Sequence, residues 1–126
     1  MVTRKTSYVV DRAPVFSWYR DHNGLIYTSG HAAVDIDSYT IERGDLLAEA
    51  QATLTNLKRT LEAAGSSLDK VLKVTVYLTD MSQYNAFNSI YAKFFKGPRP
   101  PARTCVEVAR LPLNFKVEVD VIAAVD

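Results

Sequence analysis

The chain has 126 residues and a formal charge of only +1, with 15 lysines and arginines against 14 aspartates and glutamates. The basic residues are spread along the chain, so the sequence lacks the clustered positive charge of a nucleic-acid-binding protein. Its composition, 48% hydrophobic and 23% charged, is typical of globular proteins. We expect one domain, residues 1–126, with a single core.

Several classes of protein are disfavoured by what the sequence lacks. Cys105 is the only cysteine, so no disulfide can form within the chain, and no apolar run approaches the roughly 20 residues that span a bilayer. The N-terminal residues include no apolar stretch of signal-peptide length. There is no G-x-G-x-x-G, Walker, H-E-x-x-H or C-x-x-C motif. We expect a cytoplasmic protein without metal or cofactor.

The first third of the chain predicts strands at residues 7–10, 15–20 and 25–28. Asn23-Gly24 separates two apolar runs and is the typical two-residue turn of a β-hairpin. A helix follows, because one apolar stripe recurs at spacings of three and four: Leu47, Ala50, Leu54, Leu57, Leu61 and Ala64. Asp45 is the expected N-cap of this helix and Gly65 its stop.

The second half alternates strand, helix and two strands. Leu72, Val74, Val76 and Leu78 alternate with polar residues, as in a strand. Tyr84, Phe87, Tyr91 and Phe94 predict a helix within residues 80–97, with Asp80 and Gln83 resembling a capping box. Strands are then expected at 102–108 and 117–123. This order predicts an α+β fold with two helices on one face of a mixed sheet.

The last two strands suggest how the other face of the sheet is covered. Val117, Val119 and Val121 suit the helix layer, whereas Glu118 and Asp120 point away from it. We expect Arg103, Cys105 and Glu107 to point away in the same manner. A bare second face would favour a symmetric homo-oligomer, which we expect to be a ring with charged residues near its subunit contacts.

Arg103 is the first candidate for chemistry. It follows the stiff sequence Pro98-Arg99-Pro100-Pro101, and a fixed guanidinium can bind a carboxylate or a phosphate with two parallel hydrogen bonds. The alternative is an ion pair at a subunit contact with Glu107, Glu118 or Asp120.

Three further positions have a functional and a structural interpretation each. Cys105 could be a nucleophile, but buried inert cysteine is the commoner case. Glu118 could direct a water molecule if the last two strands bring it near Arg103, or it could only neutralise a basic neighbour. Asn88 could point into a pocket or into water.

The stretch TSGHA, residues 28–32, could approach a ligand closely, since Gly30 has no side chain and Ser29 precedes it. His31 with Asp35 and Asp37 could suggest a metal site. One histidine with two loop carboxylates is more often solvated, so we expect no metal.

Four stretches of the sequence resemble the reactive intermediate deaminase family, also called Rid or YjgF: IYTSG (26–30), AAGSSLDKVLKVTVYLTDM (63–81), PPARTCVEVARLP (100–112) and KVEVDVIA (116–123). The resemblance runs from about residue 14 to residue 123. It implies a fold like that of chorismate mutase and a homotrimer with clefts at the subunit contacts. It also implies cofactor-independent hydrolysis of 2-aminoacrylate-like enamines and imines to 2-oxo acids and ammonia.

The resemblance assigns roles to matching positions. It implies that Arg103 binds the substrate carboxylate, that Cys105 lies beside it, and that Glu118 orients water. Ser29 and Gly30 match the pair that approaches the ligand, and the helix asparagine of the family matches Asn88.

One position departs from the family pattern. Phe16 stands where the family has a tyrosine, so either the phenolic hydrogen bond is lost or Tyr19 supplies it. Trp18 and His31 also differ, which suggests a larger or differently polar imine.

Two other functions remain open at this point. A non-catalytic trimer could use Arg103 to bind small carboxylates or to regulate a partner enzyme. A ribonuclease or translation-inhibitor activity is the second alternative, and the near-neutral charge argues against it.

Overall fold

The computed structural model describes residues 3–9 and 15–125. The strands are β1 (Thr3–Val9), β2 (Tyr19–His22), β3 (Leu25–Thr28), β4 (Thr40–Gly44), β5 (Val71–Leu78), β6 (Ala102–Glu107) and β7 (Val117–Ala124). The helices are α1 (Leu46–Ala63) and α2 (Tyr84–Phe94), with short 3-10 turns at Leu68–Lys70, Met81–Gln83 and Pro112–Asn114.

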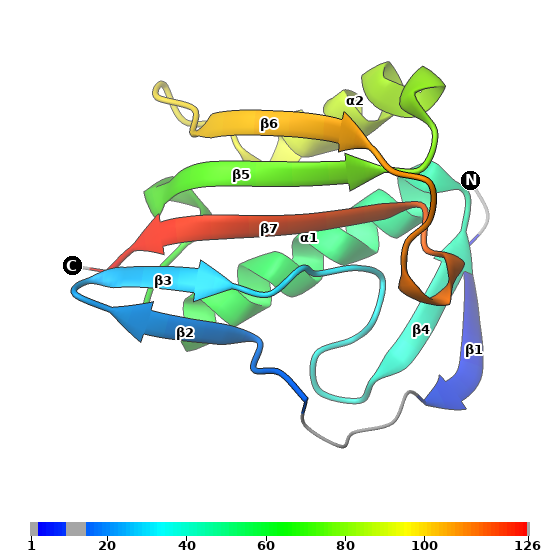
Figure 1. Ribbon diagram of the computed structural model, residues 1–126, viewed down its shortest axis with the longest axis horizontal. Coiled ribbons are helices and arrows are strands. Elements are labelled where there is room, and N and C mark those ends of the chain that lie inside the picture. The colour runs from blue at the N-terminus through cyan, green and yellow to red at the C-terminus, as the bar shows by residue number, and fades with distance from the viewer. Residues whose placement is uncertain (1–2, 10–14, 126) are drawn as a thin grey trace.

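Five strands form the main sheet in the order β2-β3-β7-β5-β6. Only the β5–β6 pair is parallel, so the sheet is mixed and mainly antiparallel. Figure 1 shows both helices behind this sheet, with its other face toward the viewer. We call the latter the open face. The predicted α+β arrangement, with two helices on one face of a mixed sheet, is confirmed.

Helix α1 follows the predicted apolar stripe. Ala50, Leu54, Leu57 and Leu61 are fully buried. The Asp45 carboxylate caps the first turn by accepting a hydrogen bond from the Ala48 N–H at 2.9 Å. Gly65 follows the helix with a φ of +85°, a conformation that other residues adopt only with strain. Both predicted helix signals are therefore confirmed.

The predicted cap of α2 is corrected by the structure. The Asp80 side chain accepts from the Ser82 N–H at 3.0 Å and so caps the 3-10 turn that precedes the helix. The N-cap of α2 itself is Gln83, whose side chain makes no capping hydrogen bond. The acidic residue therefore begins a tighter turn from which α2 continues.

A bulge alters the alternation predicted for β5. The register against β7 shifts between Val71 and Lys73, so Val71 is buried and Leu72 is 53% exposed. From Val74 onward the predicted alternation holds. An extra residue in one strand of a pair makes the side chains before it point to the opposite face from the one that strict alternation predicts. A sequence pattern with a fixed period of two residues does not show where such a bulge lies.

The N-terminal strands differ most from the expectation. The strand predicted at 7–10 lies within β1, although residue 10 is outside the described residues. The strand predicted at 15–20 begins only at Tyr19, and residues 15–18 are irregular. Strand β4 was not predicted, and it pairs with β1 in a separate two-stranded sheet.

Two apolar clusters stabilise this arrangement. The larger one lies between the main sheet and the helices and includes Phe87 and Val119. The smaller one comprises Ala33, Ile41, Leu111 and Phe115, with Val34 and Tyr77 packed against it.

Candidate active site

A hollow of about 460 Å³ opens beside the end of β3. Its apolar lining includes Phe16, Trp18, Val34, Tyr39, Leu113 and Phe115, and its polar groups come from Ser29, Gly30 and Glu118. A concave, mostly apolar space with a few convergent polar groups is the usual form of a small-molecule site. We call it the hollow from here on.

Gly30 and Glu118 are in direct contact. A Cβ added at Gly30 would lie 2.6 Å from the carboxyl carbon of Glu118, far inside van der Waals contact. The glycine therefore lets the carboxylate lie against the backbone of residue 30. Backbone hydrogen bonds between His31 and Val119, at 2.7 and 2.9 Å, hold the two segments together.

The environment of Glu118 makes its carboxylate more basic. Burial raises its pKa, and the negative charge of Asp120, two residues along the same face of β7, raises it further. A carboxylate with a raised pKa accepts a proton from water more readily. Glu118 is thus suited to act as a general base at the hollow.

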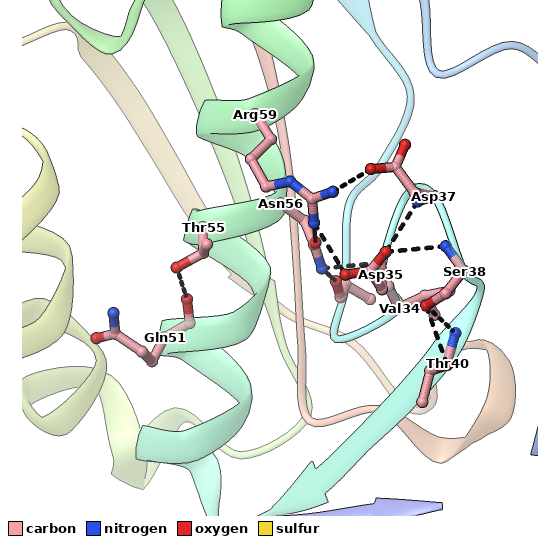
Figure 2. A network of polar contacts seen from close by, with 10 residues as sticks. Val34, Asp35, Asp37, Ser38, Thr40, Gln51, Thr55, Asn56 and Arg59 are labelled. Atoms are coloured by element: carbon pink, nitrogen blue, oxygen red, sulfur yellow. Dashed lines mark hydrogen bonds and ion pairs between the residues drawn. The ribbon is translucent and has the colours of Figure 1, made fainter. Parts of the chain in front are cut away.

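A polar network joins the loop around Val34 and Asp35 to Asn56 and Arg59 of α1 (Figure 2). The Asn56 amide donates to the carbonyls of Ala32 and Val34, at 3.2 and 2.7 Å. The Arg59 guanidinium forms ion pairs with Asp35 and Asp37. The segment that carries Val34 and Tyr39 to the hollow is therefore anchored to a helix.

Arg103 and Cys105 lie on the face opposite to the one predicted. They pair in register with Val74 and Val76 of β5, whose side chains are buried under the helices. Directly paired residues share a face, so Arg103 and Cys105 point toward the helix layer. The error arose because β6 is an edge strand, where a guanidinium can lie on the helix side and still reach solvent.

Aromatic side chains of α2 surround the Arg103 guanidinium. Its Nη2 donates to the Tyr84 hydroxyl at 3.0 Å, and its central carbon lies 4.7 Å from the centre of the Tyr91 ring. The rings of Tyr84 and Phe87 lie within 5.5 and 6.0 Å. Such stacking fixes the direction of the guanidinium without neutralising its charge.

Among the described residues of one chain, Arg103 forms no ion pair with Glu107, Glu118 or Asp120, and the alternative of an ion pair at a subunit contact stays a prediction. Glu107 accepts from the Met81 N–H at 2.7 Å, and Asp120 accepts from the Tyr77 hydroxyl at 3.0 Å. Within residues 3–9 and 15–125, the Nη1 atom of Arg103 is buried and has no hydrogen-bond partner. The arginine thus presents an unpaired donor.

Two residues of α2 also have buried polar atoms that lack hydrogen-bond partners. Across the described part of the chain, Asn88 Oδ1 and the Tyr91 hydroxyl are also buried without a partner. Burial raises the pKa of Tyr91 to about 12, so this phenol stays protonated. Each unpaired buried group costs about 1–3 kcal/mol, so Arg103, Asn88 and Tyr91 form a cluster of polar groups whose hydrogen bonds are incomplete in the single chain.

Cys105 is half-buried and packs against the main apolar cluster. Burial raises the pKa of its thiol, although the nearby Arg103 charge opposes the shift. A thiol held in its protonated form is a poor nucleophile. The contacts of Cys105 therefore favour a packing role beside Arg103.

The structure separates Arg103 from Glu118 within one chain. Strand β5 lies between β6 and β7, so the two last strands do not pair as the sequence argument required. Glu118 pairs with Tyr77 on the open face, whereas Arg103 pairs with Val74 on the helix face. One chain therefore has two half-sites, one around Glu118 and one around Arg103.

The aromatic residues near the hollow refine the question raised by Phe16. Phe16 lines the hollow and is 58% exposed. Tyr19 packs against the main apolar cluster and does not line the hollow. Sequence reasoning missed Tyr39, whose ring lies 6.0 Å from that of Trp18. Tyr39 has a φ of 60°, which is rare for residues other than glycine, and the sequence pattern does not predict this conformation.

The histidine and the two loop carboxylates do not form a metal site. His31 is fully buried and hydrogen-bonds the Ser29 carbonyl and the Thr60 hydroxyl, at 2.9 and 2.8 Å. Burial lowers its pKa to about 4, so the ring is neutral. Asp35 and Asp37 bind Arg59 instead. No cluster of three metal-binding side chains occurs among the described residues.

Comparison with known proteins gives a consistent result. A family model described as Endoribonuclease L-PSP matches residues 10–125. Protein HMF1 of Saccharomyces cerevisiae is 41% identical over 128 residues, covering 98% of both chains. The RutC family protein slr0709 of Synechocystis is 43% identical over 102 residues, covering 80% of this chain and 78% of its own.

Solved structures share the fold. RidA from the Antarctic bacterium Psychrobacter has a TM-score of 0.83 at 31% identity, covering 93% of this chain and 94% of its own. Escherichia coli TdcF, solved with bound serine, has a TM-score of 0.83 at 31% identity and covers 94% of each chain. No helix in the described residues is long and apolar enough to cross a membrane.

Proposed function

The chain belongs to the Rid or YjgF family, and on this premise we propose that it hydrolyses reactive 2-imino acids and their enamine tautomers to 2-oxo acids and ammonia. The observation that carries the proposal is the pair of unfinished half-sites. Arg103 has no ion-pair partner among the described residues and carries a positive charge suited to a carboxylate, and Glu118 offers a basic carboxylate beside an apolar hollow.

The two half-sites meet between neighbouring copies of the chain. Arg103 lies on the edge strand β6, where another protomer can approach it, while Glu118 lies on the open face. A symmetric ring brings the edge of each protomer to the hollow of the next. We therefore propose a homotrimer with three clefts, each formed by Arg103 of one protomer and Glu118 of its neighbour.

The reaction requires positioning and one proton acceptor. Arg103 holds the substrate carboxylate while Glu118 takes a proton from a water molecule. The water oxygen bonds to the imine carbon, and the electron pair of the C=N bond moves to nitrogen, which takes from Glu118 the proton that came from water. Glu118 then transfers the hydroxyl proton of this carbinolamine to the same nitrogen, the C–N bond breaks with its electron pair on nitrogen, and ammonia leaves as the carbonyl forms.

No cofactor and no covalent intermediate is needed for this sequence. Such imines already react with water, so orientation and a placed base suffice for acceleration. The protonated thiol of Cys105 agrees with a non-covalent route. Serine bound to TdcF shows that a relative accommodates a small amino acid. We propose a cytoplasmic location, in keeping with a single free cysteine.

Complementation between inactive variants tests the proposal. Arg103→Ala and Glu118→Gln should each abolish nearly all acceleration of imine hydrolysis, measured as ammonia release from the product of an amino-acid lyase. Co-expression of the two variants in equal amounts should restore about a quarter of the wild-type clefts, because random trimers pair an intact arginine with an intact glutamate at that frequency.

The outcome separates the possible arrangements. No recovery in mixed assemblies would mean that both residues act within one chain, which contradicts the proposed cleft. The double variant Arg103→Ala/Glu118→Gln, mixed in equal amounts with wild type, is the control for assembly: a shared cleft should keep about a quarter of the clefts intact, whereas a site within one chain would keep about half.

The two alternative functions have distinct signatures. A carboxylate-binding regulator would bind small 2-oxo acids through Arg103 without accelerating hydrolysis. A ribonuclease would cleave RNA, and cleavage that persists in Arg103→Ala would place that activity outside this cleft. A formal charge of only +1 argues against tight RNA binding, because affinity for RNA depends largely on basic residues that contact its phosphates.

A further inference from the structure

The lining of the hollow bears on which imine the protein accepts. We infer that the hollow binds the side chain of the substrate and selects 2-imino acids with a bulky apolar group, above all an aromatic one. This inference rests on the proposed function and adds to it the substrate class. Trp18 is the residue that determines it.

The aromatic wall is continuous and faces the hollow. The Trp18 ring lies 5.5 Å from that of Phe16, edge to face, and 6.0 Å from that of Tyr39. The centre of the Trp18 ring also lies 4.9 Å from the centre of the neutral His31 ring. A partly exposed aromatic wall gains free energy when an apolar group covers it, and rings also prefer such offset or perpendicular partners.

The volume of the hollow exceeds what the smallest substrates fill. With roughly 30 Å³ for each non-hydrogen atom, about the share of a water molecule in the liquid, 2-aminoacrylate would occupy roughly 180 Å³. The same estimate gives roughly 360 Å³ for an imine that bears a benzyl group. The hollow measures about 460 Å³. An aromatic imine therefore fits, whereas a three-carbon imine leaves most of the aromatic wall exposed to water.

The floor of the hollow argues against a neighbouring protomer's apolar side chain as its occupant. The Glu118 carboxylate lies over Gly30 inside the hollow. An apolar wedge from another chain would bury this charge without a partner, which is costly. An imine instead places its N–H or the attacking water on the carboxylate and its apolar side chain against Trp18. The Glu118 carboxylate then has a hydrogen-bond donor, and the aromatic wall is covered by apolar atoms.

Competition between two substrates tests the inference. An L-amino acid oxidase supplies the imine of phenylalanine or of alanine, and semicarbazide traps whatever imine the protein has not hydrolysed. Wild-type protein should show at least about a tenfold higher kcat/KM for the aromatic imine, because even one methylene in an apolar pocket is worth roughly tenfold or more. In Trp18→Ala the ratio of the two kcat/KM values should fall by about tenfold.

Leu72→Ala is the control, since Leu72 is an exposed apolar residue outside the hollow. Equal kcat/KM values for both imines in the wild type, or an unchanged ratio in Trp18→Ala, would overturn the inference. Calorimetry with phenylpyruvate and pyruvate distinguishes it from the proposed function. If neither imine is hydrolysed faster but phenylpyruvate binds in a Trp18-dependent manner, the deaminase function fails and the pocket assignment stands.

Discussion

Gly30 shows how a single missing side chain fixes a catalytic group. Its Cα lies under the Glu118 carboxylate, and a methyl group there would displace the carboxylate rather than the backbone. We predict that Gly30→Ala lowers kcat/KM for imine hydrolysis at least about tenfold, because a misplaced base loses its alignment with water. The free energy of unfolding should change by less than about 1 kcal/mol, since the clashing group is a flexible side chain.

Gly97→Ala provides the matched control for that substitution. A Cβ at Gly97 would meet no described atom within 4 Å. Its activity and its urea unfolding curve should both remain close to those of the wild type. A Gly30→Ala variant with full activity would show that the carboxylate position over residue 30 does not matter for the reaction.

Asp120 affects the chemistry through charge alone. Its carboxylate is the second cause, after burial, of the raised pKa of Glu118. Since Glu118 must be ionised to act as a base, kcat/KM should fall as the pH drops through that raised pKa. Asp120→Asn removes the negative neighbour and should move this acid limb to lower pH, without bringing it to the position of an ordinary glutamate, because burial remains.

A pH profile of kcat/KM for the wild type and for Asp120→Asn measures the effect. The asparagine can still accept the hydrogen bond from Tyr77, so the packing of the open face is retained. An unshifted acid limb in the variant would show that Glu118 is not the group that titrates, or that Asp120 does not influence it.

At the scale of elements, the sequence predicted correctly those features that depend on interactions between residues close together in the chain. The Asp45 cap, the apolar stripe of α1 and the hairpin at Asn23-Gly24 depend on neighbours a few residues apart, and all three are confirmed. The strand at 40–44 was missed because its two-stranded sheet with β1 leaves little alternation in TIERG. The bulge near Leu72 is likewise invisible to a pattern with a fixed period.

The face of β6 was mispredicted for a reason specific to edge strands. The rule that charged residues avoid the helix layer holds for central strands such as β7, where Glu118 lies on the open face. At the edge, Tyr84 and Tyr91 of α2 cover Arg103 and leave its Nη1 unpaired. The identity of the site residues came from motif resemblance, while their separation onto two faces came only from strand order.

At the scale of the whole molecule, the open face remains the surface to be explained. Both helices cover one side of the sheet (Figure 1). By strand register, the other side carries Tyr27, Tyr77 and Ile122 among charged residues. Tyr27 is 43% exposed, which is unusual for an aromatic residue in the middle of a sheet. Covering by other copies of the chain explains this composition and also completes the proposed cleft.

Placing a carboxylate on that face should therefore prevent assembly. Ile122 is half-buried in the single chain and would become buried between protomers, so Ile122→Glu would place an unpaired charge in an apolar contact. We predict that wild-type protein sediments with the mass of a trimer and that Ile122→Glu sediments as a monomer with almost no imine hydrolysis. Its circular dichroism should stay native, since the helix side of the sheet is untouched.

Gln51→Glu, on the exposed side of α1, adds the same charge away from the sheet and should stay trimeric and active. A monomeric Ile122→Glu that keeps wild-type activity would contradict the shared cleft, because a single chain holds Arg103 and Glu118 on opposite faces. A trimeric Ile122→Glu would instead show that the protomers meet through another surface.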